Sequence, residues 1–206
     1  MNTKDFNSII IANYFKQLFD KKGYAFFTNG DYNLNIIGIR TNHQNIVTNQ
    51  YDDIILVIYK EKGVQNHKMY QMTTEPGKHF MQESLGNPKG TAILVPGQYR
   101  SCWTIDKHRN KYYALCQCGK VKVYRDGNFN NTYDLLPEKI DEGYFGINIH
   151  RSNEAYTRQT IDQYSAGCQV FNNPKDFKEF MDLCYKQKEL YGNKFTYTLI
   201  NEEDVI

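Results

Sequence analysis

Short apolar runs separated by turn-forming residues make up most of the chain between Tyr32 and Val170. Runs of this length, rich in Ile, Val, Leu and Tyr and bounded by Gly, Asn or Asp, are typical of β-strands. None of the intervals between them has the pattern of a crossover helix of about 10–15 residues, which argues against a doubly wound α/β fold. We expect strands over 33–39, 53–59, 68–73, 91–95, 111–115, 120–124 and 145–150.

An amphipathic helix is predicted before this body, over about residues 5–21, with Gly23 at its end. The side chains expected along its apolar face are Phe6, Ile9, Ile10, Tyr14, Leu18 and Phe19.

A second helix is predicted after the body. Asn173 can cap its first turn, Pro174 suits the first helical position, and Gly192 ends it. The residues that recur at helical spacing are expected to pack into the core: Phe177, Phe180, Met181 and Cys184. Residues 195–200 are predicted to form a last strand.

Together these elements predict an α+β protein with a β-rich mixed sheet or sandwich, an N-terminal helix, and a C-terminal helix followed by a strand. We expect one domain over 1–206, with the N-terminal helix within 1–23, the β-rich body over 32–171, and the C-terminal helix and strand over 173–200.

The composition narrows the classes of partner. The chain has 206 residues, a net charge of +2 and 15% aromatic side chains. Because so small a charge supplies no basic field, we expect no nucleic-acid partner. No apolar stretch is long enough to cross a membrane, so we expect no membrane partner. The oligomeric state stays open.

The N-terminus does not have the pattern of a secretory signal. Its apolar run over 9–12 is short, Asp5 interrupts the positively charged region, and no small-residue cleavage site follows. We therefore expect synthesis in the cytoplasm. Any activity outside the cell would need a route of export other than a secretory signal.

The cysteines and histidines do not have metal-ligand spacing. The five cysteines are odd in number and irregularly spaced, which is a poor framework for disulfides. His43, His67 and His79 have no partner ligands at suitable spacing, so we expect neither a metal nor another cofactor. His108 is expected to be an exposed hairpin residue, with a substrate contact as the alternative.

One group of residues has the pattern of a nucleophilic site. His150 ends a predicted strand, and Ser165, Gly167 and Cys168 follow after a polar loop, the cysteine 18 positions after the histidine. A cysteine nucleophile needs a base to form its thiolate, and histidine is the usual one near neutral pH. We therefore expect Cys168 to be the thiol that is alkylated fastest. The alternative is a buried core thiol beside a structural histidine.

These residues resemble the catalytic signature of the L,D-transpeptidase (YkuD-like) family, in which a strand-end His is followed by Ser/Thr-x-Gly-Cys. The resemblance covers about residues 144–171. It implies a β-rich fold, Cys168 as nucleophile, His150 as base, and the peptide stems of bacterial peptidoglycan as substrate. It also implies an oxyanion hole from backbone N–H groups of the Ser165–Cys168 loop, around Gly167 and Cys168.

Two further residues flank the predicted site. Arg151 is a candidate for binding a substrate carboxylate, and Tyr144 is a second candidate for substrate contact.

The sequence also departs from the family pattern. Ala166 stands where many members have His, Arg151 where a small residue is more usual, and Gln169-Val170 where an apolar residue and Arg or Asn usually follow the cysteine. The missing polar group after the cysteine favours hydrolysis over transfer to a second peptide. Two alternatives remain: a transpeptidase that cross-links stem peptides, and a non-catalytic phage structural or wall-binding protein on the same scaffold.

Other segments resemble proteins of phages and prophages that end in a similar Ser-x-Gly-Cys-Gln-Val. They are 32–40, 73–77, 96–99 and 125–126. This resemblance implies a phage endolysin or a virion-associated lysin. Such a protein is made in the host cytoplasm and reaches the cell wall after release or as part of a virion.

Overall fold

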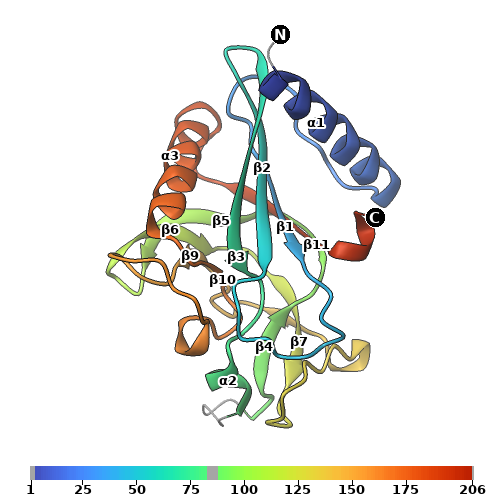
Figure 1. Cartoon of the computed structure of the whole chain (residues 1–206), viewed down its shortest axis with the longest axis vertical. Helices are drawn as coiled ribbons and strands as arrows, with labels where there is room; N and C mark the ends of the chain where they lie inside the picture. Colours follow the sequence, from blue (N-terminus) through green and yellow to red (C-terminus); the bar gives the residue numbers. More distant parts are fainter. Residues whose placement is uncertain (1–2, 83–87, 206) are drawn as a thin grey trace.

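The computed structural model describes residues 3–82 and 88–205 (Figure 1). Most of its strands belong to one large sheet: β1 (Asn35–Arg40), β2 (Asp53–Glu61), β3 (Val64–Thr73), β5 (Gly97–His108), β6 (Tyr112–Gln117), β9 (Ile149–Arg151), β10 (Gln169–Phe171) and β11 (Phe195–Asn201). This sheet closes into a barrel in the order β1-β11-β5-β6-β9-β10-β3-β2. A separate three-stranded sheet contains β4 (Thr91–Leu94), β7 (Val121–Asp126) and β8 (Asp141–Gly143), in the order β4-β7-β8.

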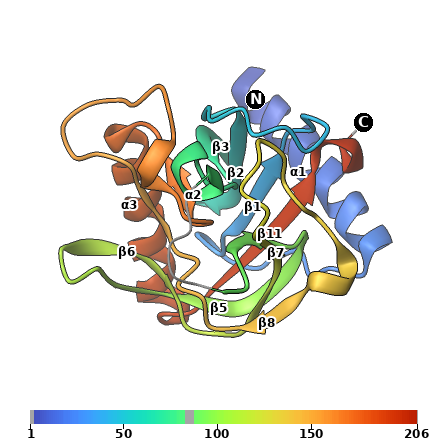
Figure 2. The ribbon, with the colours of Figure 1, turned by 90° about the horizontal axis from the view of Figure 1, so that it is seen from below.

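The helices lie outside the sheets. They are α1 (Thr3–Lys22), α2 (Lys78–Gln82) and α3 (Pro174–Tyr191), with three short 3-10 helices, η1 (Pro137–Lys139), η2 (Asp162–Tyr164) and η3 (Glu202–Asp204). Seen from below, α1 and α3 lie on opposite sides of the strands (Figure 2).

The predicted α+β, β-rich class is confirmed, as is the mixed character of the sheet. Two pairs in the barrel are parallel, β1 with β11 and β9 with β10, and the others are antiparallel. The closure of the sheet into a barrel was not predicted. Neither was β5, the longest strand, because its first half is only partly buried and Ser101 interrupts it with a φ of 57°.

Helix α1 was predicted almost to its bounds, but its buried face was predicted only in part, since Leu18 and Phe19 pack against the sheet as expected and Ile10 and Tyr14 do not. Ala12, Phe15 and Phe19 pack onto the outer surface of β1, β2 and β11, whereas Ile10 and Tyr14 are 50% and 42% exposed. The two exposed residues lie on the opposite side of a helix with 3.6 residues per turn. Packing of the two Phe rings against the sheet therefore selects the face. The side chain of Phe6 lies outside the described residues.

Helix α3 and the strand after it agree closely with the prediction. The Asn173 side chain accepts the Lys175 N–H (2.9 Å), and Gly192 ends the helix with a φ of 85°. The four predicted contact residues are buried in the main core: Phe177, Phe180, Met181 and Cys184. Phe177 also meets the rings of Phe171 on β10 and Tyr112 on β6, so α3 supports the strands that carry the predicted site.

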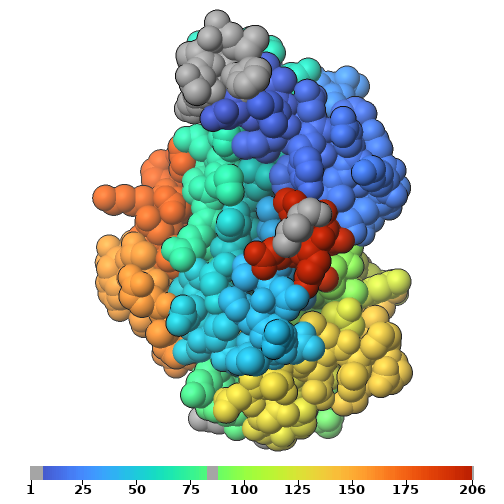
Figure 3. Space-filling view, turned by 45° about the vertical axis from the view of Figure 1, so that its right-hand side comes forward, coloured from blue at the N-terminus to red at the C-terminus, as the bar shows by residue number. Residues whose placement is uncertain are grey.

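The C-terminal turn packs against α1, as the space-filling view shows (Figure 3). Lys22 and Asp204 form an ion pair at 2.6 Å, and the Tyr14 hydroxyl donates to the Val205 carbonyl. Within residues 3–82 and 88–205, no helix is long and apolar enough to cross a membrane.

Candidate active site

The parallel pair β9–β10 brings the predicted base and nucleophile together. His150 pairs with Val170, and the Gln169 N–H donates to the Asn148 carbonyl (2.9 Å), which places Cys168 beside Asn148. Because side chains alternate along a strand, His150 and Cys168 lie on the same face of the sheet, as diagonal neighbours. Strand spacing and rise put their Cα atoms about 8 Å apart. The face opposite theirs points into the core, where Ile149 and Phe171 are fully buried.

A tight turn presents the cysteine at the start of β10. The Ser165 hydroxyl donates to the Cys168 carbonyl (2.8 Å) and accepts the Gly167 N–H (3.2 Å). Gly167 has a φ of 111°, and a Cβ added to it would lie 2.0 Å from the Ala92 carbonyl oxygen. Only glycine fits this position. The Gly167 N–H already donates to the Ser165 hydroxyl. The Cys168 backbone N–H donates to no atom in the described part of the chain, so it is the group that can bind an oxyanion.

The Cys168 thiol is half-buried and held by backbone groups. It donates to the Gly146 carbonyl (3.3 Å), accepts the Asn148 N–H (3.4 Å), and packs against Tyr51, Ile161 and Val170. Burial raises the pKa of this thiol, although the Asn148 N–H and the positive charge of Arg109 lower it in part. The resting group near neutral pH is therefore a neutral thiol.

His150 is buried and oriented as an acceptor. Its Nδ1 lies 2.9 Å from the Arg151 carbonyl and 3.4 Å from the Tyr112 hydroxyl. A carbonyl only accepts, so Nδ1 carries the proton and Nε2 is left with a free lone pair. Burial, together with the neighbouring His108, lowers the pKa of His150 to about 3, so the ring is neutral. His150 and Cys168 share no hydrogen bond in this arrangement.

His108 belongs to the site, although the sequence analysis expected an exposed hairpin residue and gave a substrate contact only as the alternative. It is 6% exposed, contrary to the exposed position predicted, because its ring stacks on that of His150 with centroids 4.2 Å apart and an interplanar angle of 21°. Its Nδ1 accepts from the Asn148 side chain (3.0 Å), whose backbone N–H contacts Cys168. Burial lowers the pKa of His108 to about 4. The sequence did hold a signal for this strand, because the apolar Trp103 and Ile105 stand two positions apart, as on one face of a strand that leads to His108.

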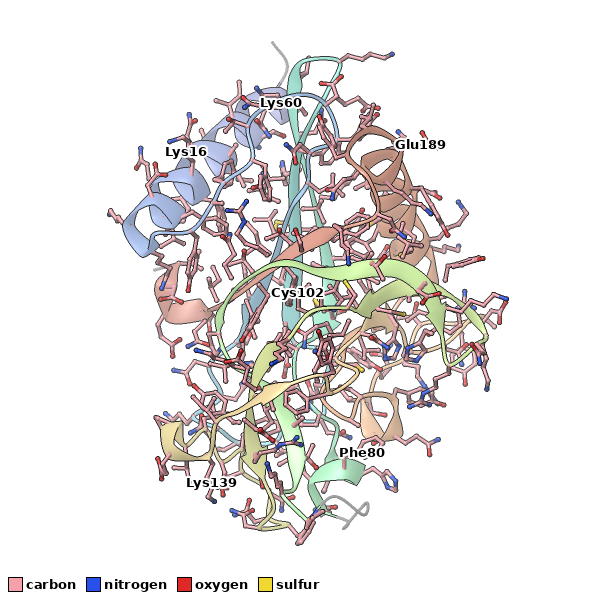
Figure 4. The ribbon with its side chains drawn as sticks, turned by 180° about the vertical axis from the view of Figure 1, so that it is seen from behind. Lys16, Lys60, Phe80, Cys102, Lys139 and Glu189 are labelled. Carbon is pink, nitrogen blue, oxygen red and sulfur yellow. The ribbon has the colours of Figure 1, made fainter. Side chains whose placement is uncertain are left out.

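A pocket of about 420 Å³ opens on the exposed side of the two histidines. Its walls come from α2, from the β5–β6 hairpin, from β9 with the residue after it, and from η2: His79, Phe80, His108, Arg109, Lys111, Tyr112, His150, Arg151, Ser152, Gln163 and Tyr164. Figure 4 views the molecule from the side of β5, with Phe80 below the hairpin. An adjoining hollow of about 320 Å³ continues towards Asn153 and Glu154. Cys168 does not line the pocket, whereas His150 does.

The two predicted substrate-contact residues differ in position. Arg151 lines the pocket, stacks 4.2 Å over the Tyr112 ring and pairs with Glu154 at 3.3 Å. Tyr144 is 66% exposed and lies outside the pocket lining. The structure therefore brings Arg151 to His150 and leaves Tyr144 apart.

Buried polar contacts fasten the start of β10 to the barrel. Gln169, the unusual residue after the cysteine, is fully buried and accepts from the Tyr197 hydroxyl (2.8 Å), while its amide donates to the Thr74 and Gly167 carbonyls (3.3 Å each). The segment after β3 also supports the turn, since the Gly77 N–H donates to the Ser165 carbonyl (2.9 Å). The segment 73–77 thus belongs to the support of the site.

The thiols are unpaired with one another, and the described acidic residues do not gather with them. All five cysteines are free thiols, and Cys184 is fully buried, as predicted. In the described ranges, no group of three or more His, Cys, Asp or Glu residues is arranged to hold a metal ion.

Comparisons with protein-family models, with curated proteins and with solved structures found no match.

Proposed function

We propose that this chain is a cysteine-dependent peptidase of peptidoglycan stem peptides, on an L,D-transpeptidase-like scaffold. The observation that carries the proposal is the placement of His150 and Cys168 on one face of two adjacent parallel strands, beside a pocket. The Nδ1 contact with the Arg151 carbonyl leaves His150 Nε2 as the acceptor that such a reaction requires. A phage lysin acting on the host wall remains the biological setting we favour.

The reaction begins with transfer of the Cys168 proton to His150 Nε2. The sulfur then attacks the peptide carbonyl, and the Cys168 N–H stabilises the negative oxygen. As the C–N bond breaks, His150 returns its proton to the leaving amine, and the acyl group stays on sulfur as a thioester. Water then attacks the thioester carbonyl and gives one proton to His150. The C–S bond breaks, the new carboxylic acid leaves, and His150 passes the proton to the Cys168 thiolate. Because the resting thiol and Nε2 share no hydrogen bond, binding of the substrate has to bring them together.

The buried position of Gln169 supports hydrolysis over transfer. Its side chain is used by Tyr197 and by two carbonyls, so the residue after the cysteine offers no group to a second peptide. A transpeptidase would need to place its acceptor amine by other residues.

One observation favours a non-catalytic wall-binding protein as the second candidate. The Cys168 thiol donates to the Gly146 carbonyl and shares no hydrogen bond with His150, as expected for a structural thiol. This candidate predicts that Cys168→Ala protein binds peptidoglycan as well as the wild type and that neither form cuts it.

Mass spectrometry of purified peptidoglycan after incubation with the protein tests the proposal. Wild type should release new stem-peptide fragments, while Cys168→Ala and His150→Ala should release none. Cys102→Ser is the matched control: Cys102 is also a half-buried thiol, but it is distant in sequence from Cys168, so this variant should retain activity. Incorporation of an added D-amino acid would identify a transferase. Fragments released equally by wild type and Cys168→Ala would exclude the proposed nucleophile.

A further inference from the structure

The pocket beside His150 is cationic. Arg109, Lys111 and Arg151 line it, and none of the lining residues that the structure describes is acidic. Its size is in the range of pockets that hold small molecules or single peptide residues, about 300–1,000 Å³. A ligand seated there would meet three positive side chains and no carboxylate within the lining.

Two of these three cations make no hydrogen bond or ion pair with the described residues. Arg151 is already paired with Glu154 and stacked on Tyr112. By contrast, the exposed side chains of Arg109 and Lys111 form no hydrogen bond or ion pair with any residue that the structure describes. Both are therefore available to a ligand.

The hairpin holds these two cations in a defined place. Arg109 and Asn110 have positive φ angles of 50° and 56°, and the Lys111 N–H donates to the His108 carbonyl (3.0 Å), as in a tight type I′ turn. His108, at the start of this turn, stacks on His150. The turn thus fixes the backbone positions from which both cations extend, next to the proposed base.

The charge of Arg109 also reaches the reacting groups. It acts on the thiol of Cys168 and on the rings of His108 and His150. Arg109 and His150 line the same pocket, so an anion bound there by Arg109 would lie on the side of the proposed base.

We propose that Arg109 and Lys111 bind a carboxylate of the substrate, so that the preferred peptide carries a free carboxylate near the bond that is cut. This inference rests on the proposed peptidase function for the identity of the ligand. The positive site itself can be tested without any cleavage. Arginine can hold a carboxylate through two parallel hydrogen bonds, and lysine adds a second charge.

Alkylation of Cys168 tests the site directly. Iodoacetate is anionic and iodoacetamide is neutral, so the ratio of their rates at Cys168, read by peptide mapping at mildly alkaline pH, reports the charge near the thiol. A change in thiolate fraction alters both rates and cancels in the ratio. Arg109→Gln should lower the ratio about threefold, and Arg109→Gln with Lys111→Gln should lower it further, because a nearby charge in water-like surroundings shifts such a rate by this order. Lys107→Gln, an exposed cation outside the pocket, is the control and should leave the ratio unchanged.

Cleavage of paired peptides tests the ligand. Wild type should have a kcat/KM about tenfold higher for a stem peptide with a free carboxylate than for its carboxamide, as expected for one charge-assisted bidentate contact. Arg109→Gln should abolish this preference, and Arg109→Lys should restore part of it.

The outcomes separate the two proposals. An unchanged alkylation ratio in Arg109→Gln would overturn the carboxylate site, even if Cys168→Ala showed that the peptidase function is right. Equal cleavage of carboxylate and carboxamide peptides by wild type would overturn it as well. A lowered ratio in a protein that cuts no peptidoglycan would support the cationic site and refute the peptidase function.

Discussion

Replacing His108 with Phe should make the stability of the protein much less sensitive to mild acid. His108 and His150 are each 6% exposed and stack at 4.2 Å, and burial lowers their pKa values to about 4 and about 3. A Phe ring preserves the stacking and the exclusion of water but cannot take up a proton. Tyr112, Arg151, Arg109, Cys168 and Asn148, which surround the pair, are unchanged in the variant.

The size of the effect follows from proton binding. Below the ordinary histidine pKa of about 6.5, the unfolded chain binds a proton on each histidine, whereas the folded protein does so only near its lowered pKa. The free energy of unfolding therefore falls as the pH drops from about 6.5 towards 4. Between about pH 7 and pH 5, each such histidine costs about 2 kcal/mol of stability. His108→Phe should remove one of these two contributions.

Other buried groups titrate in the same range, so the difference between variant and wild type is the quantity to measure. Burial raises the pKa of Glu75 to about 8, which makes the fold more stable as the pH falls from 8 towards its ordinary value. This contribution has the opposite sign and is common to both proteins.

Urea unfolding followed by the fluorescence of Trp103, the only tryptophan and fully buried, measures the effect at a series of pH values. The stability of His108→Phe relative to wild type should rise by about 2 kcal/mol from pH 7 to pH 5. Tyr112→Phe removes a neighbouring hydroxyl whose pKa is raised by burial to about 12, so it should run parallel to wild type. Parallel curves for His108→Phe and wild type would refute the view that the stacked histidines are both neutral.

Two further substitutions test the support of the cysteine turn. Gln169→Leu should lower the free energy of unfolding by about 3 kcal/mol, because it breaks three buried hydrogen bonds and leaves the Tyr197 hydroxyl unpaired; in a double-mutant cycle with Tyr197→Phe, strictly additive losses would contradict this. Gly167→Ala should lower the thermal midpoint strongly, because its Cβ would lie 2.0 Å from the Ala92 carbonyl oxygen. Gly146→Ala, at a φ of 72° with open space around the Cβ, should lower the free energy of unfolding by only about 1 kcal/mol. Equal losses of stability for the two variants would count against the steric argument.

Features set by neighbouring residues could be predicted from the sequence. Asn173, Pro174 and Gly192 define the ends of α3 because capping and backbone freedom act within one helical turn. Ser165 and Gly167 likewise shape the turn before Cys168 through contacts across three positions. The alternating apolar runs were enough for the β-rich class, since burial on a strand repeats every second residue.

Contacts between distant residues decided the rest. Three features depend on contacts between residues far apart in the sequence: the face of α1 that is exposed, the closure of the barrel, and the stacking of His108 on His150. A pattern of neighbouring residues carries no information on such contacts. The state of the Cys168 thiol also belongs here. The spacing of His150 and Cys168 pointed to a nucleophile and its base, but the burial of both groups, which only packing produces, determines that the resting pair is neutral.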